Sequence, residues 1–252
     1  MYIGNINIIY YVLIGLLGLV AGQFVDWINF RLPQYKKVFS KEFFTIYMKN
    51  FKPKYILMFT MSIIYIAILY FVGWQNNIIY RINLIKYLTL APMLLSVFII
   101  DYKLQIIPNR LNLWIFEIGM IFTFIEGFFN INYAINMLLG SLTGAGIFLI
   151  ITLLGGVIAG KEAMGFGDVK LMGALGLFFG WINMIIISLI SFLLAAVISI
   201  ILIVTKLKKA NEYIPFGPFI VIATFIVMLA PFDVLIFCLM KIFTLGMYKG
   251  KV

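Results

Sequence analysis

Residues 171–204 read LMGALGLFFGWINMIIISLISFLLAAVISIILIV, a stretch without a single charged side chain. One crossing of a lipid bilayer by a helix needs about 20 predominantly apolar residues, so this stretch is longer than one crossing requires. Gly180-Trp181 interrupts it, and we predict a short span over 170–181 followed by a second span over 183–204. The stretch therefore predicts a membrane protein.

The rest of the chain continues this pattern. Of the 252 residues, 64% are hydrophobic and 11% are charged, whereas soluble domains are about 45–50% apolar and 25% charged. We predict an all-α, polytopic membrane helix bundle of about eight transmembrane helices. The remaining expected spans are 8–28, 55–73, 83–100, 113–129, 135–158 and 217–238. The first lacks the basic start and small-residue cleavage site of a signal peptide, so we expect it to be retained. Pro231 and Asp233 interrupt the last one, which leaves the topology of residues 231–252 open.

The basic residues predict the orientation of the bundle. Fourteen of the 19 Lys and Arg residues fall in the alternate loops 31–54, 101–112, 159–170 and 205–216. Because Lys and Arg collect in cytoplasmic loops, we expect these loops in the cytosol and the N-terminus outside. The basic residues separate apolar runs, so the net charge of +10 indicates membrane topology and not nucleic-acid binding. We expect the basic loop 31–54 to contact anionic lipid head groups.

Small residues recur four apart at three places, a spacing that lets membrane helices approach closely. The pairs are Gly18/Gly22, Gly140/Gly144 and Gly176/Gly180. We expect tight helix packing at each pair.

The composition excludes several kinds of catalytic site. The chain has no histidine and a single cysteine, Cys238, so an intramolecular disulfide and the Cys/His zinc patterns are excluded. Catalysis by a Ser–His or Cys–His pair is excluded for the same reason. Proton transfer then rests on the nine carboxylates, a lysine or a tyrosine.

Two of the nine acids stand out by position. Asp101 ends an apolar span and Asp168 begins one, both at the same predicted membrane surface. If the two helices are neighbours, the carboxylates meet and form a catalytic pair. The alternatives are structural: Asp168 as an N-cap, which Asp favours, and Asp101 as an acid at the interface.

Glycines flank the second acid in Gly165-Phe166-Gly167-Asp168. A glycine permits positive φ or the close approach of another chain, so this segment fits either a loop against an extended peptide or a simple turn. It lacks the Gly-Lys-Ser/Thr ending of a phosphate-binding loop.

These residues resemble a known family. Gly-Phe-Gly-Asp is the GxGD signature of intramembrane aspartyl proteases, and the longer segment GKEAMGFGDVKLMGALGLFFGW at 160–181 closely resembles the type IV prepilin peptidases. Three further blocks agree in order: Asp101 with IPNRL at 107–111, IPFGPF at 214–219, and Gly22, Phe24 and Arg31-Leu32-Pro33. The resemblance covers about residues 15–220.

The resemblance implies an aspartyl endopeptidase of the bacterial inner membrane that acts at the cytosolic face. Its substrates are type IV prepilins and pilin-like precursors, which lose a basic leader after a glycine. The catalytic residues carried over by motif are Asp101 and Asp168, and two close carboxylates of this kind share one proton. The residues associated with the active-site loop or substrate are Gly165, Gly167, Lys170, Pro108 and Asn109. The implied domains are a six-helix protease core at 83–252 and an N-terminal membrane part at 1–82.

Many family members also methylate the new N-terminus with S-adenosylmethionine, and the resemblance associates the N-terminal block with that activity. Candidate residues are Gly22, Asp26 and Arg31, although a local ion pair between Asp26 and Arg31 explains these two equally well. The block departs from the usual Gly-Ser-Phe-Leu-Asn, since it reads Gly22-Gln-Phe-Val-Asp26. Loop 31–54 has no cysteine, whereas many bacterial members carry two zinc-binding CxxC pairs there, so we expect no zinc.

Two other functions compete with the peptidase. In a proton- or cation-coupled transporter, Asp101 and Asp168 would bind or relay the ion, but such proteins carry acids nearer mid-membrane and interrupted helices in repeated halves. A non-catalytic scaffold leaves the glycine–aspartate block unexplained.

Overall fold

The computed structural model describes residues 2–3, 6–38, 41–47, 49, 52–74, 77–159, 164–207 and 213–244. Its main elements are helices: α1 (Ile8–Arg31), α2 (Tyr55–Val72), α3 (Ile78–Leu104), α4 (Asn109–Phe129), α5 (Ile131–Ala159), α6 (Phe166–Val204), α7 (Gly217–Leu229) and α8 (Phe232–Phe243). Short helical turns, η1 (Leu32–Gln34) and η2 (Phe43–Tyr47), follow α1. The strands β1 (Tyr2–Ile3) and β2 (Ile6–Asn7) form a small antiparallel pair before α1, which the sequence did not predict.

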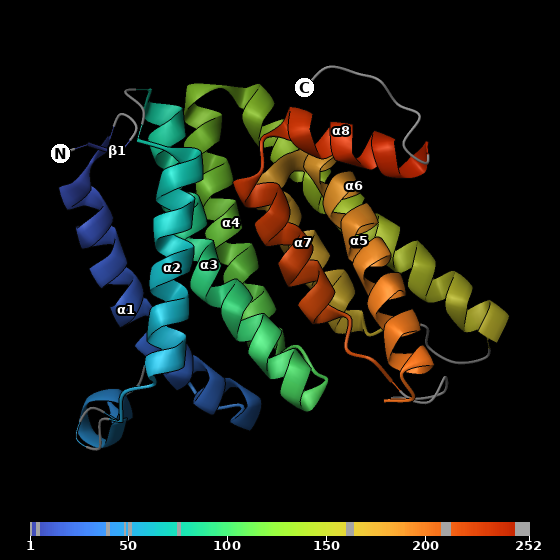
Figure 1. The fold of residues 1–252 in the computed structure, drawn as a ribbon, viewed down its shortest axis with the longest axis horizontal. Coiled ribbons are helices and arrows are strands. Elements are labelled where there is room, and N and C mark those ends of the chain that lie inside the picture. The colour runs from blue at the N-terminus through green and yellow to red at the C-terminus, as the bar shows by residue number, and fades with distance from the viewer. Residues whose placement is uncertain are drawn as a thin grey trace.

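The expected all-α, polytopic bundle is confirmed. Within the described ranges, six helices (α1 to α6) are long and apolar enough to cross a membrane. Figure 1 shows α1 to α7 side by side, with the C-terminal ends of α1, α3, α5 and α6 at the same lower end of the bundle. We call this the site end. The count of eight spans and the orientation of the N-terminus stay predictions.

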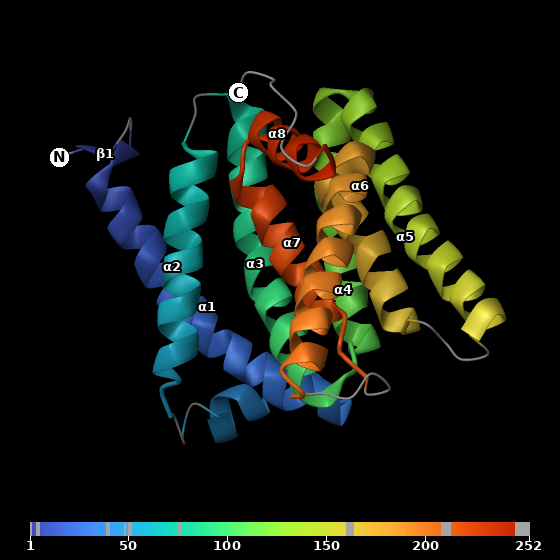
Figure 2. The ribbon, with the colours of Figure 1, turned by 45° about the vertical axis from the view of Figure 1, so that its right-hand side comes forward.

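Helix α6 turns back on itself at Gly180, which agrees with the predicted division at Gly180-Trp181. Gly180 has φ 74° and ψ 171°, a left-handed conformation that favours glycine. Met172 on the first arm and Met184 on the second both lie against Gly144 of α5, and Figure 2 shows the two arms side by side. A straight helix of 39 residues would be about 58 Å long, so the reversal lets both arms lie within the bundle.

The three predicted glycine pairs all lie at close helix contacts. Gly18 and Gly22 pack against the backbone of α2 at Ser62 and Leu57, where a Cβ would collide. Gly140 packs in the same way against Gly176 and Gly180. Because membrane helices associate through packing and not through a hydrophobic driving force, these contacts determine how closely α1 approaches α2 and α5 approaches α6.

The interruption expected at Pro231 in the predicted last span, 217–238, is present. The chain breaks at Ala230-Pro231, and α8 crosses the bundle at the end opposite the site end (Figure 1). Pro231 has no N–H and disfavours helical geometry in the residue before it, and Ala230 is extended at φ −89°, ψ 139°.

A buried ion pair joins α3 and α4. Lys86 Nζ lies 2.5 Å from Glu126 Oε1, and the two side chains are 1% and 4% exposed. Lys86 lies about two turns after the start of α3 at Ile78. Glu126 lies in the last turn of α4 and is buried.

Candidate active site

Asp101 lies one turn before the end of α3 and is 3% exposed. Its Oδ2 accepts a hydrogen bond of 2.9 Å from the backbone N–H of Gly217, the first residue of α7. Backbone N–H groups at a helix start have no partner within the helix, so the Asp101 carboxylate takes up one of them. The interface-acid interpretation of Asp101 is therefore wrong, since the side chain points into the bundle.

Asp168 is the third residue of α6 and is 4% exposed. Its N–H donates to Gly165 O at 3.0 Å, and Gly165 is the N-cap residue of α6. The N-cap interpretation of Asp168 is therefore wrong. Its Oδ1 is buried and has no hydrogen-bond partner in the part of the chain that the structure describes, which leaves one carboxylate oxygen available for chemistry.

The structure brings the two aspartates within electrostatic range of each other, and their role as a catalytic pair stays a prediction. Asp168 interacts electrostatically with Asp101, although they come from different helices. Tyr213, in the segment before α7, interacts electrostatically with both carboxylates. Burial, and then the charges of Asp168 and Asp101, raise the pKa of the Tyr213 hydroxyl, so this group stays protonated beside the pair. The sequence interpretation missed Tyr213, and nothing in the sequence marked it.

The glycines before Asp168 do not adopt positive φ, and Gly167 instead permits a close approach. Gly165 has φ −69° and Gly167 lies within α6, so neither has positive φ. The close neighbour of Gly167 is Ile107 of the α3–α4 connection, whose Cβ would lie 3.2 Å from a Cβ at position 167. Gly167 O also accepts a hydrogen bond of 3.0 Å from Asn112 Nδ2 of α4. These contacts hold the start of α6 against the start of α4.

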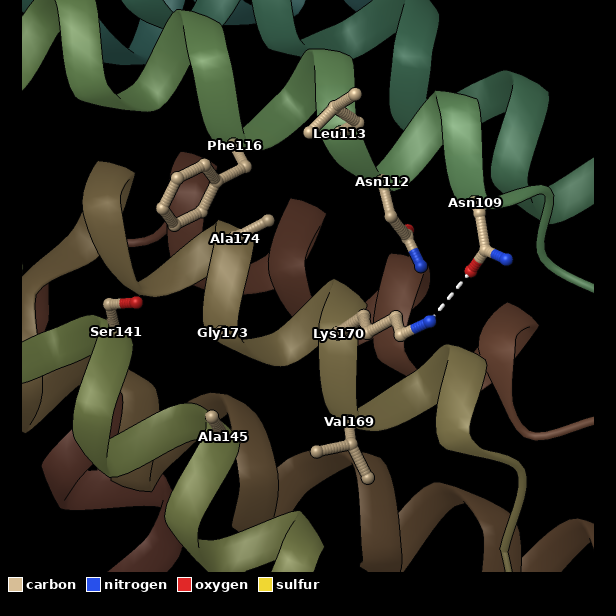
Figure 3. Close-up of a pocket in the computed structure, with 10 residues that line it drawn as sticks. All are labelled: Asn109, Asn112, Leu113, Phe116, Ser141, Ala145, Val169, Lys170, Gly173 and Ala174. Atoms are coloured by element: carbon tan, nitrogen blue, oxygen red, sulfur yellow. Dashed lines mark hydrogen bonds between the residues drawn. The ribbon is translucent and has the colours of Figure 1, made fainter.

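The remaining active-site-loop candidates lie at the start of α4. Pro108 is buried and is the N-cap residue of α4. Lys170 Nζ donates to Asn109 Oδ1 at 2.9 Å (Figure 3), and no ion pair among the described residues joins Lys170 to either aspartate. Lys170 therefore links α6 to α4 and does not neutralise the pair.

A cavity of about 520 Å³ lies between α4, α5 and α6 beside the Asp168 segment (Figure 3). The residues that line it are Asn109, Asn112, Leu113, Phe116, Ser141, Ala145, Val169, Lys170, Gly173 and Ala174. The aspartates themselves do not line it. Its α6 residues, Val169, Lys170, Gly173 and Ala174, lie on the side of that helix opposite Asp168.

The N-terminal candidates lie apart from this site. Gly22 packs on α2, as described above. The Asp26–Arg31 ion pair is wrong: Arg31 pairs with Glu42, while Asp26 Oδ2 accepts a hydrogen bond of 3.0 Å from Tyr47. Burial, and then the Asp26 charge, hold the pKa of Tyr47 well above its usual range.

Aromatic rings surround this hydrogen bond. The rings of Trp27 and Tyr47 have centroids 4.9 Å apart, and those of Trp27 and Phe43 are 5.5 Å apart. No group of three or more acidic or cysteine side chains gathers within the described ranges. The absence of zinc stays a prediction.

The fold and the site together define a multi-pass helical membrane protein with a buried aspartate pair at one end of its bundle. Residues 88–200 match the model of the type IV leader peptidase family. The family resemblance drawn from the motifs is thereby confirmed. The matches give no support to the transporter alternative.

Curated relatives agree with this family. The chain is 32% identical to a prepilin leader peptidase/N-methyltransferase of Aeromonas hydrophila over 142 residues, which are 56% of this chain and 48% of that protein. It is 32% identical to the one of Legionella pneumophila (59% and 51%) and 29% identical to the one of Pseudomonas aeruginosa (63% and 53%). The chain thus spans about half the length of the curated relatives it matches. No solved structure matches it.

Proposed function

We propose that this protein is an aspartyl endopeptidase that removes the basic leader from type IV prepilins and pilin-like precursors. The observation that carries the proposal is the meeting of Asp101 and Asp168, both buried and electrostatically coupled, in a chain whose residues 88–200 match the type IV leader peptidase family. The relatives named above are prepilin leader peptidases, and residues 83–252 carry the activity in this proposal.

The chemistry follows from two carboxylates that share one proton. The ionised carboxylate takes a proton from a water molecule, whose oxygen attacks the scissile carbonyl carbon. The protonated carboxyl donates its proton to the carbonyl oxygen, which gives a tetrahedral diol. When the diol collapses, the C–N bond breaks and the leaving nitrogen takes up a proton. The pair titrates as a unit, and the Gly217 N–H holds Asp101 in place throughout.

The site faces the cytosol of a bacterial inner membrane in this proposal. Its support is charge: exposed lysines follow α1 at the same end of the bundle as the aspartates. They are Lys36, Lys37, Lys41, Lys49, Lys52 and Lys54. Juxtamembrane lysines favour the cytoplasmic leaflet, whose anionic lipids attract each of them by about 1 kcal/mol.

The test uses the purified full chain in liposomes with a synthetic prepilin, and mass spectrometry reads the products. Cleavage after the leader glycine is expected in the wild type and absent in Asp101→Asn and Asp168→Asn. Asp233→Asn, an exposed aspartate in the first turn of α8, is the matched control and should cleave normally. Normal cleavage by either site variant would remove that residue from the mechanism.

A second activity, N-methylation of the new N-terminus with S-adenosylmethionine, is favoured by the relatives' names. We place it in residues 1–82. S-adenosylmethionine is a cation, and the residues around Asp26 fit a cation. Asn29 Oδ1 is buried without a partner among the described residues, and Asn29 lies one turn from Asp26 on α1. A carboxylate and aromatic faces are the groups that attract organic cations, and Trp27 and Tyr47 supply the rings. When bound, S-adenosylmethionine supplies a methyl group, and Asp26 would hold the positive charge beside the substrate amine.

Calorimetry in detergent tests this binding separately from catalysis. We expect S-adenosylmethionine to bind the wild type and to bind Asp26→Ala more weakly, and we expect labelled methyl transfer to a cleaved pilin to fall in parallel. Undiminished binding and transfer in Asp26→Ala would exclude the residue. No transfer by a chain that cleaves would leave a peptidase alone.

A further inference from the structure

We propose that α8 is an interfacial anchor, which lies in the lipid of the leaflet opposite the site end and holds the adjoining end of α7 there. We call that end of the bundle the far end. Figure 1 and Figure 2 show α8 lying across the far end, whereas α1 to α7 run along the bundle. The lipid-contacting surface is an apolar stripe of exposed side chains: Phe232, Ile236, Met240 and Phe243. The inference does not depend on the proposed function.

The stripe is one side of an amphipathic helix. Its members recur at spacings of four, four and three residues, so they share one face of α8. Leu235 and Leu239 lie on the neighbouring face and are buried in the core of the bundle. The charged Asp233 and Lys241 lie beyond the other edge of the stripe. The order around α8 is therefore buried leucines, exposed apolar stripe and charged side chains, as expected for a helix that lies between protein, lipid and water.

The bundle covers too little of α8 to hold it by itself. Of the twelve residues of this helix, the structure buries Leu235 and Leu239. Helices of about 12 residues are marginal in water and depend on the burial of an apolar face. The stripe therefore needs a second apolar environment, which the boundary between head groups and acyl chains provides.

Tyrosine and tryptophan side chains mark the level of the membrane interface at the far end. Both residue types gather at the level of the lipid head groups. The exposed ones at this end lie within three residues of a helix terminus or of the reversal at Gly180, and they are Tyr10, Tyr70, Trp74, Tyr80, Tyr133 and Trp181. Helix α8 begins three residues after α7 ends at Leu229. It therefore starts at the level that these aromatic residues mark.

The anchor matters for α7 because α7 is short. Its 13 residues span about 20 Å, whereas the hydrocarbon layer is roughly 30 Å thick. Helix α7 therefore cannot reach both interfaces by itself. At its start, the Gly217 N–H bonds Asp101, and at its other end Pro231 leads directly into α8. An α8 fixed in the interface thus sets the depth of α7, and we expect α7 to loosen when the lipid contact is lost.

Spin labels test what covers the stripe. In a Cys238→Ser background, which removes the one cysteine of the chain, Met240→Cys and Lys241→Cys each receive a nitroxide label in liposomes. The two positions are neighbours, but one belongs to the stripe and the other to the charged side. We expect the label at 240 to collide mainly with oxygen dissolved in the lipid, and the label at 241 with a water-soluble nickel complex.

Two outcomes of the spin-label experiment would overturn the proposal. Nickel access to both labels would show that water covers the stripe. A label at 240 that neither reagent reaches would show that a second protein chain covers it.

Hydrogen exchange in liposomes tests the anchoring of α7. Ile236→Ser/Met240→Ser removes the middle of the stripe, and the backbone amides of 217–229 should then exchange faster than in the wild type. Lys241→Ser, on the charged side of the same helix, is the control and should exchange at the wild-type rate. Unchanged exchange of α7 in the folded double variant would overturn the anchor. If the double variant does not fold, Met240→Ser alone decides, with the same expected direction.

Discussion

Gly217→Ala is the substitution that most directly tests how the site is held. The Gly217 N–H lies 2.9 Å from Asp101 Oδ2. A Cβ at position 217 would lie 2.6 Å from the same oxygen and 3.0 Å from Cγ. Real Cβ atoms do not approach this closely, so the Asp101 carboxylate must move away.

The distances give the size of the effect. Ordinary contact begins at 3.4 Å, so the oxygen must move by about 0.8 Å. A misplacement of about 1 Å in a catalytic group can cost on the order of 10²-fold in rate. Alanine gains about 0.5–1 kcal/mol of helix stability over glycine, which partly offsets an overpacking cost of about 1–3 kcal/mol. We therefore expect a large loss of activity and a small change in the free energy of unfolding.

The assay measures kcat and KM for prepilin cleavage in liposomes, together with thermal unfolding in detergent. The expected result is a kcat lower by on the order of 10²-fold with KM nearly unchanged, since a displaced catalytic group weakens an interaction made in the transition state and not substrate binding. Gly146→Ala is the matched control, because a Cβ there has no atom within 4 Å. It should keep wild-type kinetics.

A folded Gly217→Ala that cleaves at the wild-type rate would refute the reasoning. It would mean that cleavage does not require the Asp101 oxygen bonded to Gly217 to stay at its present position. A variant whose activity falls only in proportion to its folded fraction would show that the contact stabilises the bundle and does not position the carboxylate.

Three further predictions follow from the same contacts. Asp101→Asn and Asp168→Asn should each abolish cleavage, and the double variant should be no worse than either, because the pair acts as a unit; additive losses would contradict a shared proton. Lys86→Met should destabilise the protein by about 3–5 kcal/mol, since it leaves Glu126 buried without its partner. The double variant Lys86→Met/Glu126→Leu should regain most of the lost stability, as measured by thermal unfolding. EDTA should leave cleavage unchanged, and the purified protein should contain far less than one zinc per chain; stoichiometric zinc with EDTA-sensitive cleavage would disprove this.

The sequence by itself determined the class of protein and the two acids at its centre. Apolar runs of membrane length require helices whatever their neighbours, because the backbone in lipid must satisfy its own hydrogen bonds. The reversal at Gly180 and the packing of Gly140 against α6 were also predictable, since a missing side chain is a local property. Asp101 and Asp168 could be selected because so few acids compete with them.

The tertiary structure alone decided which groups surround the pair. Gly217 and Tyr213 come to the pair from a segment far from both aspartates in the chain. Asn112 of α4 bonds Gly167 at the start of α6, and the partner of Lys86 lies on the next helix. Arg31 pairs with Glu42 and not with the nearer Asp26. The physical reason is that side-chain contacts between helices depend on tilt and rotation, which packing against neighbouring helices sets and the length of an apolar run does not.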